Sequence, residues 1–228
     1  GRVEDIFDLQ DRITESVVSA IAPTIRTAEI ERARRKRPQN LEAHDYVMRA
    51  LPHVWALTSA DSAAALRLTA EAIKLDPSHG VANALAGWCH AWQYCNDWTA
   101  TPDRTRNEGL DLARTALKLD ADDPTVLAMV AASVMLLAHD LEQAAELTER
   151  ALRLDPNSTW AWIRSGYVHV YRGDAETALA HFERARRLSP FDPFNFNIHV
   201  GIALAHFAAE RYEQACEWAE KGLRERSD

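Results

Sequence analysis

The sequence predicts an all-α fold, a right-handed superhelix of about five antiparallel helix hairpins with extra helices at its N-terminal end. Three observations support this prediction. A short motif that ends a helix recurs along the chain, the 228 residues include only 8 glycines, and no segment of any length shows the alternation of a strand. Hydrophobic residues make up 47% of the chain, which is enough for a buried core.

The first predicted element is an amphipathic helix in segment 5–21. Its apolar residues recur every three or four positions and form one stripe, which comprises Ile6, Leu9, Ile13, Val17, Ala20 and Ile21. Pro23 then permits a second helix, which runs into the basic stretch 32–37. We expect this stretch to be a solvated helix end, since cations are favourable near a helix C-terminus. Neither helix fits the repeat, so residues 1–37 are separated from a repeat region at 38–228.

The repeat is found by aligning the chain with itself. The segments 70–77 (AEAIKLDP), 148–156 (TERALRLDP) and 182–190 (FERARRLSP) superpose, and 113–121 matches them except that Ala121 replaces the proline. The step from Pro156 to Pro190 is 34 residues. Such a period is typical of stacked helix–turn–helix units.

The clearest unit is Thr159 to Asp192. Counted from its first residue, this unit has a large apolar residue at position 4, small residues at positions 8, 20 and 27, an aromatic residue at position 24 and proline at position 32. In that order of kinds, the residues are Trp162; Gly166, Ala178 and Ala185; Phe182; and Pro190. Small residues let two helices approach closely, the aromatic ring fills the space between neighbouring hairpins, and proline ends the second helix. This is the pattern of the tetratricopeptide repeat (TPR).

Four less regular units complete the count of five. The unit from Thr125 to Ser158 places Ala132, Ala144, Ala151 and Pro156 at positions 8, 20, 27 and 32. The unit from Gly80 has extra residues at 96–105, which we expect to form a long turn. The first unit spans about 43–79 with Tyr46, Ala50, Ala65 and Ala72, and the last starts near Phe196 with Ala203, Tyr212, Ala215 and Gly222.

Local signals agree with these boundaries. A capping side chain precedes a first-turn proline at Thr101-Pro102, Asp123-Pro124 and Asp192-Pro193. Gly173-Asp174 predicts a turn followed by an N-cap. Pro52 falls inside a predicted helix, which it is expected to kink or shorten.

The chain resembles the TPR region of bacterial proteins in which a class III adenylate/guanylate cyclase domain is followed by a TolB-like domain and TPRs. The resemblance lies in the segments 5–14 (DIFDLQDRIT), 34–54 (RRKRPQNLEAHDYVMRALPHV) and 188–196 (LSPFDPFNF). It implies that 1–37 closes a TolB-like part, that a cyclase domain would lie upstream of Gly1, and that the chain is a fragment of a longer protein.

Composition and motifs argue against chemistry on the chain itself. The net charge of −8 disfavours nucleic acid, and no apolar run is long enough to span a membrane. Three cysteines without an export signal favour a cytoplasmic protein. Cys89 and Cys95 project to different faces of a helix, so a metal site with His90 is not expected. We expect no catalytic residue, metal or cofactor.

Histidines recur at position 11 of three units, as His90, His169 and His206. A repeated place in a scaffold indicates a repeated packing role. We therefore expect these side chains to lie in the core or in the groove of their hairpin, and not to act as acids or bases.

The predicted binding surface is the concave groove lined by positions 2, 5, 9 and 12 of the first helices. The site residues are Trp88, Val126, Met129, Leu136, Trp160, Ile163, Tyr167, Val170, Asn197, Val200, Leu204 and Phe207, with Val81, Ala84 and Ser133 at equivalent positions. Clamps for acidic C-terminal peptides offer Lys, Arg and Asn there, whereas only Arg164 and Asn197 come near that pattern. The apolar and aromatic lining fits an amphipathic helix better.

That helix is expected from another protein, or from segment 5–21 packed in cis or swapped into a homodimer. Two alternatives stay open, in which the lining residues pack between repeats or form a small-molecule pocket. The sequence thus predicts a non-catalytic protein-interaction scaffold that regulates an upstream cyclase. The alternative function is a self-assembly module of a TolB-like/TPR protein without a cyclase domain.

Overall fold

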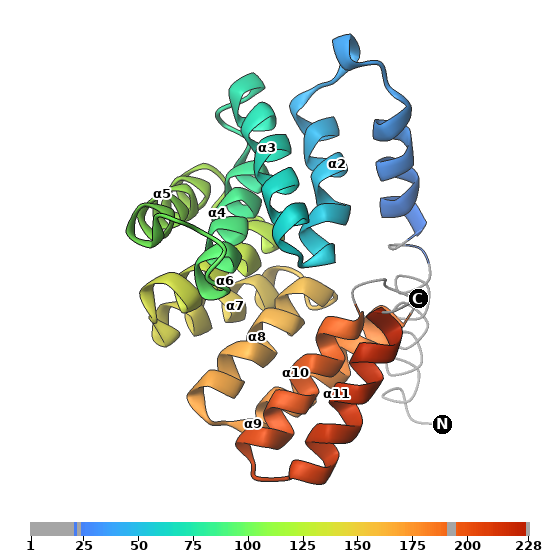
Figure 1. Cartoon of the computed structure of the whole chain (residues 1–228), viewed down its shortest axis with the longest axis vertical. Helices are drawn as coiled ribbons and strands as arrows, with labels where there is room; N and C mark the ends of the chain where they lie inside the picture. Colours follow the sequence, from blue (N-terminus) through green and yellow to red (C-terminus); the bar gives the residue numbers. More distant parts are fainter. Residues whose placement is uncertain (1–20, 22–23, 191–194, 227–228) are drawn as a thin grey trace, which may run out of the picture.

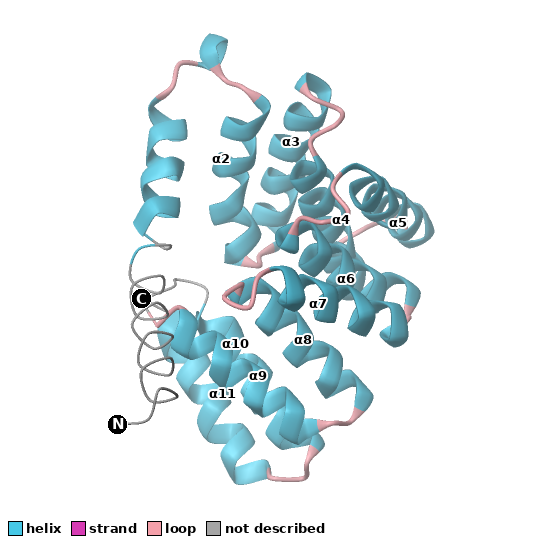
Figure 2. Cartoon of the chain, turned by 180° about the vertical axis from the view of Figure 1, so that it is seen from behind, coloured by secondary structure: helices cyan, strands magenta, loops and turns pink. Residues whose placement is uncertain are grey.

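The computed structural model describes Ile21 and the residues 24–190 and 195–226, and every regular element in these ranges is a helix (Figures 1 and 2). Ten of them form five consecutive hairpins, as the repeat count predicts. The hairpins are α2 (Ala43–Ala56) with α3 (Ser59–Leu75), α4 (Gly80–Cys95) with α5 (Pro102–Leu119), α6 (Pro124–Ala138) with α7 (Leu141–Leu154), α8 (Thr159–Arg172) with α9 (Ala175–Leu188), and α10 (Asn195–Ala208) with α11 (Tyr212–Arg226).

The hairpins stack in sequence order into a curved array of two layers. The first helices contact one another in the series α2, α4, α6, α8 and α10, and form the inner layer. Each second helix touches its own partner and, from α3 to α9, the first helix of the next hairpin. The described chain is therefore an all-α, TPR-type superhelix whose concave side is built by the first helices (Figure 1).

Small residues hold the hairpins together where the repeat pattern predicts them. The side chains of seven alanines at positions 20 and 27 are fully buried, namely Ala65, Ala72, Ala116, Ala144, Ala151, Ala178 and Ala185. Phe182 at position 24 is fully buried as well. An alanine in place of Gly166 would bring its Cβ to 2.7 Å from the Phe182 ring, so α8 and α9 meet at a distance that only glycine allows.

The predicted caps are confirmed at two turns. Asp123 Oδ1 accepts hydrogen bonds from the backbone N–H groups of Thr125 (2.7 Å) and Val126 (2.9 Å). Gly173 ends α8 with φ of +78°, and the Asp174 side chain accepts from the N–H of Thr177. Thr101 makes no side-chain cap although Pro102 starts α5, and Asp192-Pro193 lies outside the described residues.

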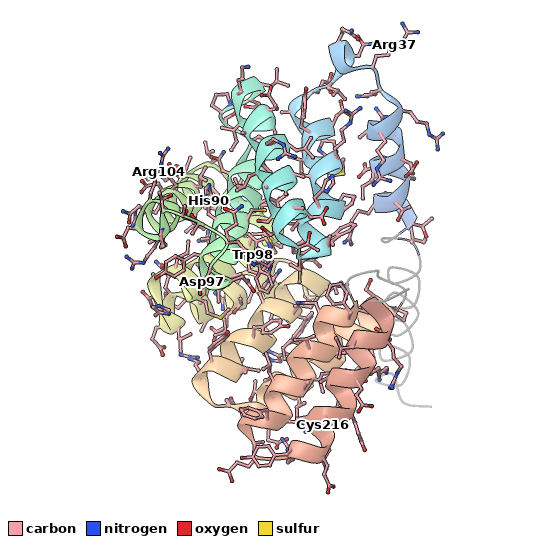
Figure 3. All side chains as sticks on the ribbon, viewed as in Figure 1. Arg37, His90, Asp97, Trp98, Arg104 and Cys216 are labelled. Carbon is pink, nitrogen blue, oxygen red and sulfur yellow. The ribbon has the colours of Figure 1, made fainter. Side chains whose placement is uncertain are left out.

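The turn expected at 96–105 is shorter in the structure. The turn between α4 and α5 covers only 96–101, because 102–105 already belong to α5 (the turn's Asp97 and Trp98 are labelled in Figure 3). The first-turn proline fixes a helical φ, and the Thr105 N–H donates to the Thr101 carbonyl at 2.9 Å, so the extra residues lengthen the helix. Pro52 does not shorten α2, which continues to Ala56.

A helix over residues 24–35 lies beside α2 and extends the array (Figures 1 and 2). Its Ile30 and Ala33 are buried, and Arg49 of α2 donates from Nε and Nη2 to the Ala33 carbonyl at 3.0 and 2.8 Å. Four arginines of the basic stretch are exposed at its end, namely Arg32, Arg34, Arg35 and Arg37. The arginine side chains of the stretch are thus solvated at a helix terminus, as expected, whereas Lys36 pairs with the buried Asp45.

Candidate binding site on the concave face

The inner helices surround a cavity of about 230 Å³, which we call the Arg164 pocket. Every hairpin contributes to its wall. The lining residues are Leu57, Trp88, Trp92, Met135, Leu136, Arg164, Tyr167, Tyr171, Phe196, Asn197, Val200, Leu204, Gly222 and Leu223. The curvature of the array brings these distant parts of the chain together.

Arg164 is the one cation among the described residues of this lining, and its side chain is only 3% exposed. The guanidinium carbon lies 4.1 Å from the centroid of the Trp88 ring and 5.7 Å from that of Trp160, within the range of a cation–π contact. Burial lowers the pKa of Arg164 to about 10, so the group remains charged at neutral pH.

The aromatic residues of the pocket are held in place by their neighbours. The Tyr167 hydroxyl donates to the backbone carbonyl of Asn197 at 2.8 Å and thereby links α8 to α10. The Tyr167 ring also meets Phe182 edge-on, with 5.2 Å between centroids. Trp88 and Trp92 lie one turn apart on α4, with ring centroids 5.5 Å apart. The walls are therefore fixed by packing between repeats.

A second, larger cavity of about 630 Å³ lies beside the first turns of α4, α6 and α8, and we call it the N-terminal groove. Its other wall comes from α2 and from helix 24–35, which contributes Ile25, Arg26 and Glu29. The helix that the sequence placed before the repeats therefore shapes part of the surface. Segment 5–21 lies outside the described residues, apart from Ile21.

The structure divides the twelve predicted site residues into distinct groups. Six line the Arg164 pocket, namely Trp88, Leu136, Tyr167, Asn197, Val200 and Leu204, and Trp160 lines the N-terminal groove. Val170 is half-buried against the core, and Phe207 is 62% exposed and contacts Tyr212.

Three of the predicted residues, Val126, Met129 and Ile163, do not reach the concave surface, because they are buried at 0%, 0% and 3% exposure. Neighbouring inner helices touch one another, so positions 2 and 5 of α6 and position 5 of α8 pack between repeats. Val81 lies in the N-terminal groove, and Ala84 and Ser133 are buried.

Sequence reasoning placed Arg164 and Asn197 near a clamp pattern but left Arg164 out of the site. The available signal was a cation within the aromatic run 159–168 (TWAWIRSGYV). Trp92 was also missed, although it follows Trp88 by one helical turn. The contributions of Leu57 and Leu223 depend on curvature, for which the repeat pattern gives no measure.

The histidines at position 11 have the expected packing role in α4 and α8. His90 is half-buried where α4 meets α5 (Figure 3), and burial lowers its pKa. His169 meets His181 of α9 edge-on, with 5.0 Å between centroids. His206 is half-buried too, and its pKa is lowered first by burial and then by Arg211.

Neither a metal-binding cluster nor a membrane-spanning helix is found among the described residues. These residues contain no group of three His, Cys, Asp or Glu side chains that could hold a metal ion. Cys89 is buried, which raises the pKa of its thiol to about 12, whereas Cys95 is exposed. In the same ranges, none of the helices has both the length and the apolar character needed to cross a bilayer.

The fold and its repeats are those of a TPR superhelix. Residues 132–193 and 163–228 match the family model for the tetratricopeptide repeat. Two solved structures share the fold with a TM-score of 0.60. A thermophilic TPR protein of Thermus thermophilus is 18% identical, with 80% of this chain and 91% of that chain covered. A chain of the APC/C hetero-tetramer Cut9-Hcn1 is 16% identical, with 92% and 38% covered.

Among curated proteins, the chain is similar to Putative adenylate cyclase 3 of Rhizobium meliloti (strain 1021), with 30% identity over 123 residues. That match covers 54% of this chain and 21% of the relative. It is also 27% identical over 81 residues to a DnaJ homolog subfamily C member 7 homolog of Schizosaccharomyces pombe, which covers 36% of this chain and 17% of that protein. The chain spans about a fifth of the length of these relatives.

Proposed function

We propose that this chain is a protein-interaction scaffold that binds an amphipathic helix or peptide on its concave face. One observation carries the proposal. Large apolar side chains are exposed on the neighbouring inner helices α8 and α10, where Tyr171 is 56%, Val200 40%, Leu204 40% and Phe207 62% exposed. A contiguous apolar surface of this kind is typical of a site that another protein covers.

We further propose that partner binding regulates a nucleotide cyclase domain in a longer protein. The support is the similarity of 123 residues of this chain to part of a protein named Putative adenylate cyclase 3. An array that changes curvature when a partner binds could transmit that change to a domain attached to its N-terminal helices.

A double substitution tests both parts of the proposal. Leu204→Ser with Phe207→Ser removes apolar surface from exposed positions on α10 without opening the core. In a cyclase-containing protein with these repeats, we expect the variant to alter basal activity or its response to a bound helical peptide. Leu154→Ser, an exposed position at the end of α7, is the matched control. Activity and peptide affinity unchanged from the control would contradict the proposal.

The source of the helix is a separate question. A synthetic peptide of residues 5–21 can be titrated into a chain that starts at residue 22. Saturable binding that the α10 double variant loses would identify the chain's own segment as the occupant. Light scattering over a concentration series then separates packing in cis from exchange within a dimer.

Self-assembly is the second candidate function. It is favoured by α11, where Tyr212 is 57% and Leu223 66% exposed on the last hairpin. If these side chains join two arrays, the average mass should rise with concentration and return to the monomer value in Leu223→Ser. A monomer at every concentration would exclude this function.

A further inference from the structure

The Arg164 pocket contains a buried cation whose hydrogen-bonding capacity is not used by the described residues around it. The Nε and Nη2 atoms of Arg164 are shielded from solvent and donate to no acceptor in this part of the chain. These two atoms are adjacent on the guanidinium group. Their N–H groups form the parallel fork that matches the two oxygens of one carboxylate.

Two further polar atoms in the same lining lack partners among the residues that the structure describes. Trp92 Nε1 is a buried donor, and Asn197 Oδ1 is a buried amide oxygen. The Asn197 amide can rotate to present its NH₂ group instead, because its oxygen and nitrogen are nearly interchangeable in shape. Buried polar groups in proteins are normally satisfied, so this cluster points to an absent hydrogen-bonding ligand.

The rest of the lining selects the body of that ligand. Apart from Arg164 and Asn197, the cavity is walled mainly by aromatic and aliphatic side chains. A phosphate dianion would leave excess charge in this apolar site, since Arg164 is the one cation of the described wall. A carboxylate carries the single charge that Arg164 can neutralise, and an apolar body attached to it would contact the rings.

Size separates a small molecule from a docked helix. The volume of about 230 Å³ would hold roughly eight water molecules. An α-helix with its side chains is about 10 Å across, so it cannot enter such a cavity. Leu57 from the first hairpin and Leu223 from the last also border the pocket, so it is walled from both ends of the array.

We propose that the Arg164 pocket binds a small carboxylic acid with an aromatic or short branched apolar body. The carboxylate accepts the two N–H groups of Arg164, with Trp92 and Asn197 as further donors. The hydrocarbon body lies against Trp88, Tyr167 and Leu204. The pocket shares Tyr171, Val200 and Leu204 with the proposed peptide surface, so a bound acid would alter the surface on which a partner helix docks.

Isothermal titration of the whole chain with phenylacetate and 4-methylpentanoate tests the proposal, with phenylacetamide as the neutral isostere of the first acid. We expect at least one acid to bind, with its affinity reduced at least about tenfold in the amide and in Arg164→Met. Arg164→Lys keeps the charge but loses the fork, so it should weaken binding as well. Arg172→Met, whose arginine pairs with Glu142 of α7 and does not line the pocket, should bind like the wild type.

Circular dichroism establishes that each variant is folded, and Arg164→Lys decides the matter if Arg164→Met is not. Equal affinity for acid and amide would overturn the proposal, as would undiminished binding to the Arg164 variants or no binding of either acid at about 10 mM. An acidic helical peptide forms a further arm. If the peptide alone binds, and needs Arg164, the small-molecule proposal fails while the proposed scaffold function stands.

Discussion

Phe182 shows how one side chain connects two repeats. It is fully buried, and it occupies the space left by the missing side chains of Gly166 in its own hairpin and Gly201 in the next. A Cβ atom added to Gly201 would lie 2.3 Å from the Phe182 ring. The Phe182 ring therefore sets the distance between its own hairpin and the next.

Gly201→Ala should destabilise the chain by about 1–3 kcal/mol, because the ring has no empty space to move into. The intrinsic preference of helices for alanine would offset up to about 1 kcal/mol of this. The free energy of urea unfolding measures the difference. Gly222→Ala is the control, since its nearest neighbour would be 3.3 Å away. A Gly201→Ala protein as stable as the control would show that the ring can shift freely.

His181 makes stability depend on pH. Burial, with a smaller effect of His169, lowers its pKa to about 4. The unfolded chain therefore takes up a proton first as the pH falls below about 6.5, and stability decreases from there towards pH 4. Because the ring is only half-buried, we expect a loss of about 2 kcal/mol.

Urea unfolding of the wild type and of His181→Gln at a series of pH values tests this prediction. Glutamine can keep a hydrogen bond to Ser165, whose Oγ lies 3.0 Å from His181 Nδ1. The variant should lose less stability on acidification. Some dependence should remain, since burial also lowers the pKa of His90 and of His199. Identical pH profiles would remove His181 as the cause.

At the scale of elements, helix 24–35 is attached to the repeats through its C-terminus. Arg49 donates to the carbonyl groups of Ala33 and, at 2.9 Å, of Lys36, and Lys36 pairs with Asp45 at 2.7 Å. These bonds satisfy carbonyl groups that a helix end leaves without partners. The sequence placed a boundary after residue 37, and that boundary remains a prediction, but these contacts cross it.

Arg49→Met should loosen helix 24–35 while the hairpins stay folded. We expect faster amide hydrogen exchange in residues 28–36, corresponding to about 1–3 kcal/mol of lost local protection. Arg67→Met, at an exposed position on α3, is the control. Unchanged exchange in the Arg49 variant would mean that Ile30 and Ala33 hold the helix alone.

At the scale of the whole molecule, the spacing of the repeat residues located the hairpins more accurately than it identified the residues of the binding surface. The small residues at positions 20 and 27 lie where the two helices of a hairpin pack against each other and against the adjacent hairpins. The burial of Ala144 and Ala178 could therefore be predicted from sequence. Accessibility along the inner helices depends on how closely they approach. Met129 was therefore expected on the surface but is fully buried, whereas Arg164, which was not among the expected site residues, lines the pocket.

The core is continuous from Ile30 to Ala205, and this predicts cooperative unfolding. Tryptophan fluorescence and far-ultraviolet circular dichroism should report one urea transition with the same midpoint. A repeat array can also unfold in stages when its interfaces are weak. Two separate midpoints would show that one of these interfaces fails before the others.

The cavity beside Arg164 is bordered by side chains as far apart in the chain as Leu57 and Leu223. Its dimensions therefore depend on the pitch of the entire coil. A change in the curvature of the superhelix at any hairpin, including one caused by a mechanical load, would enlarge or shrink this cavity.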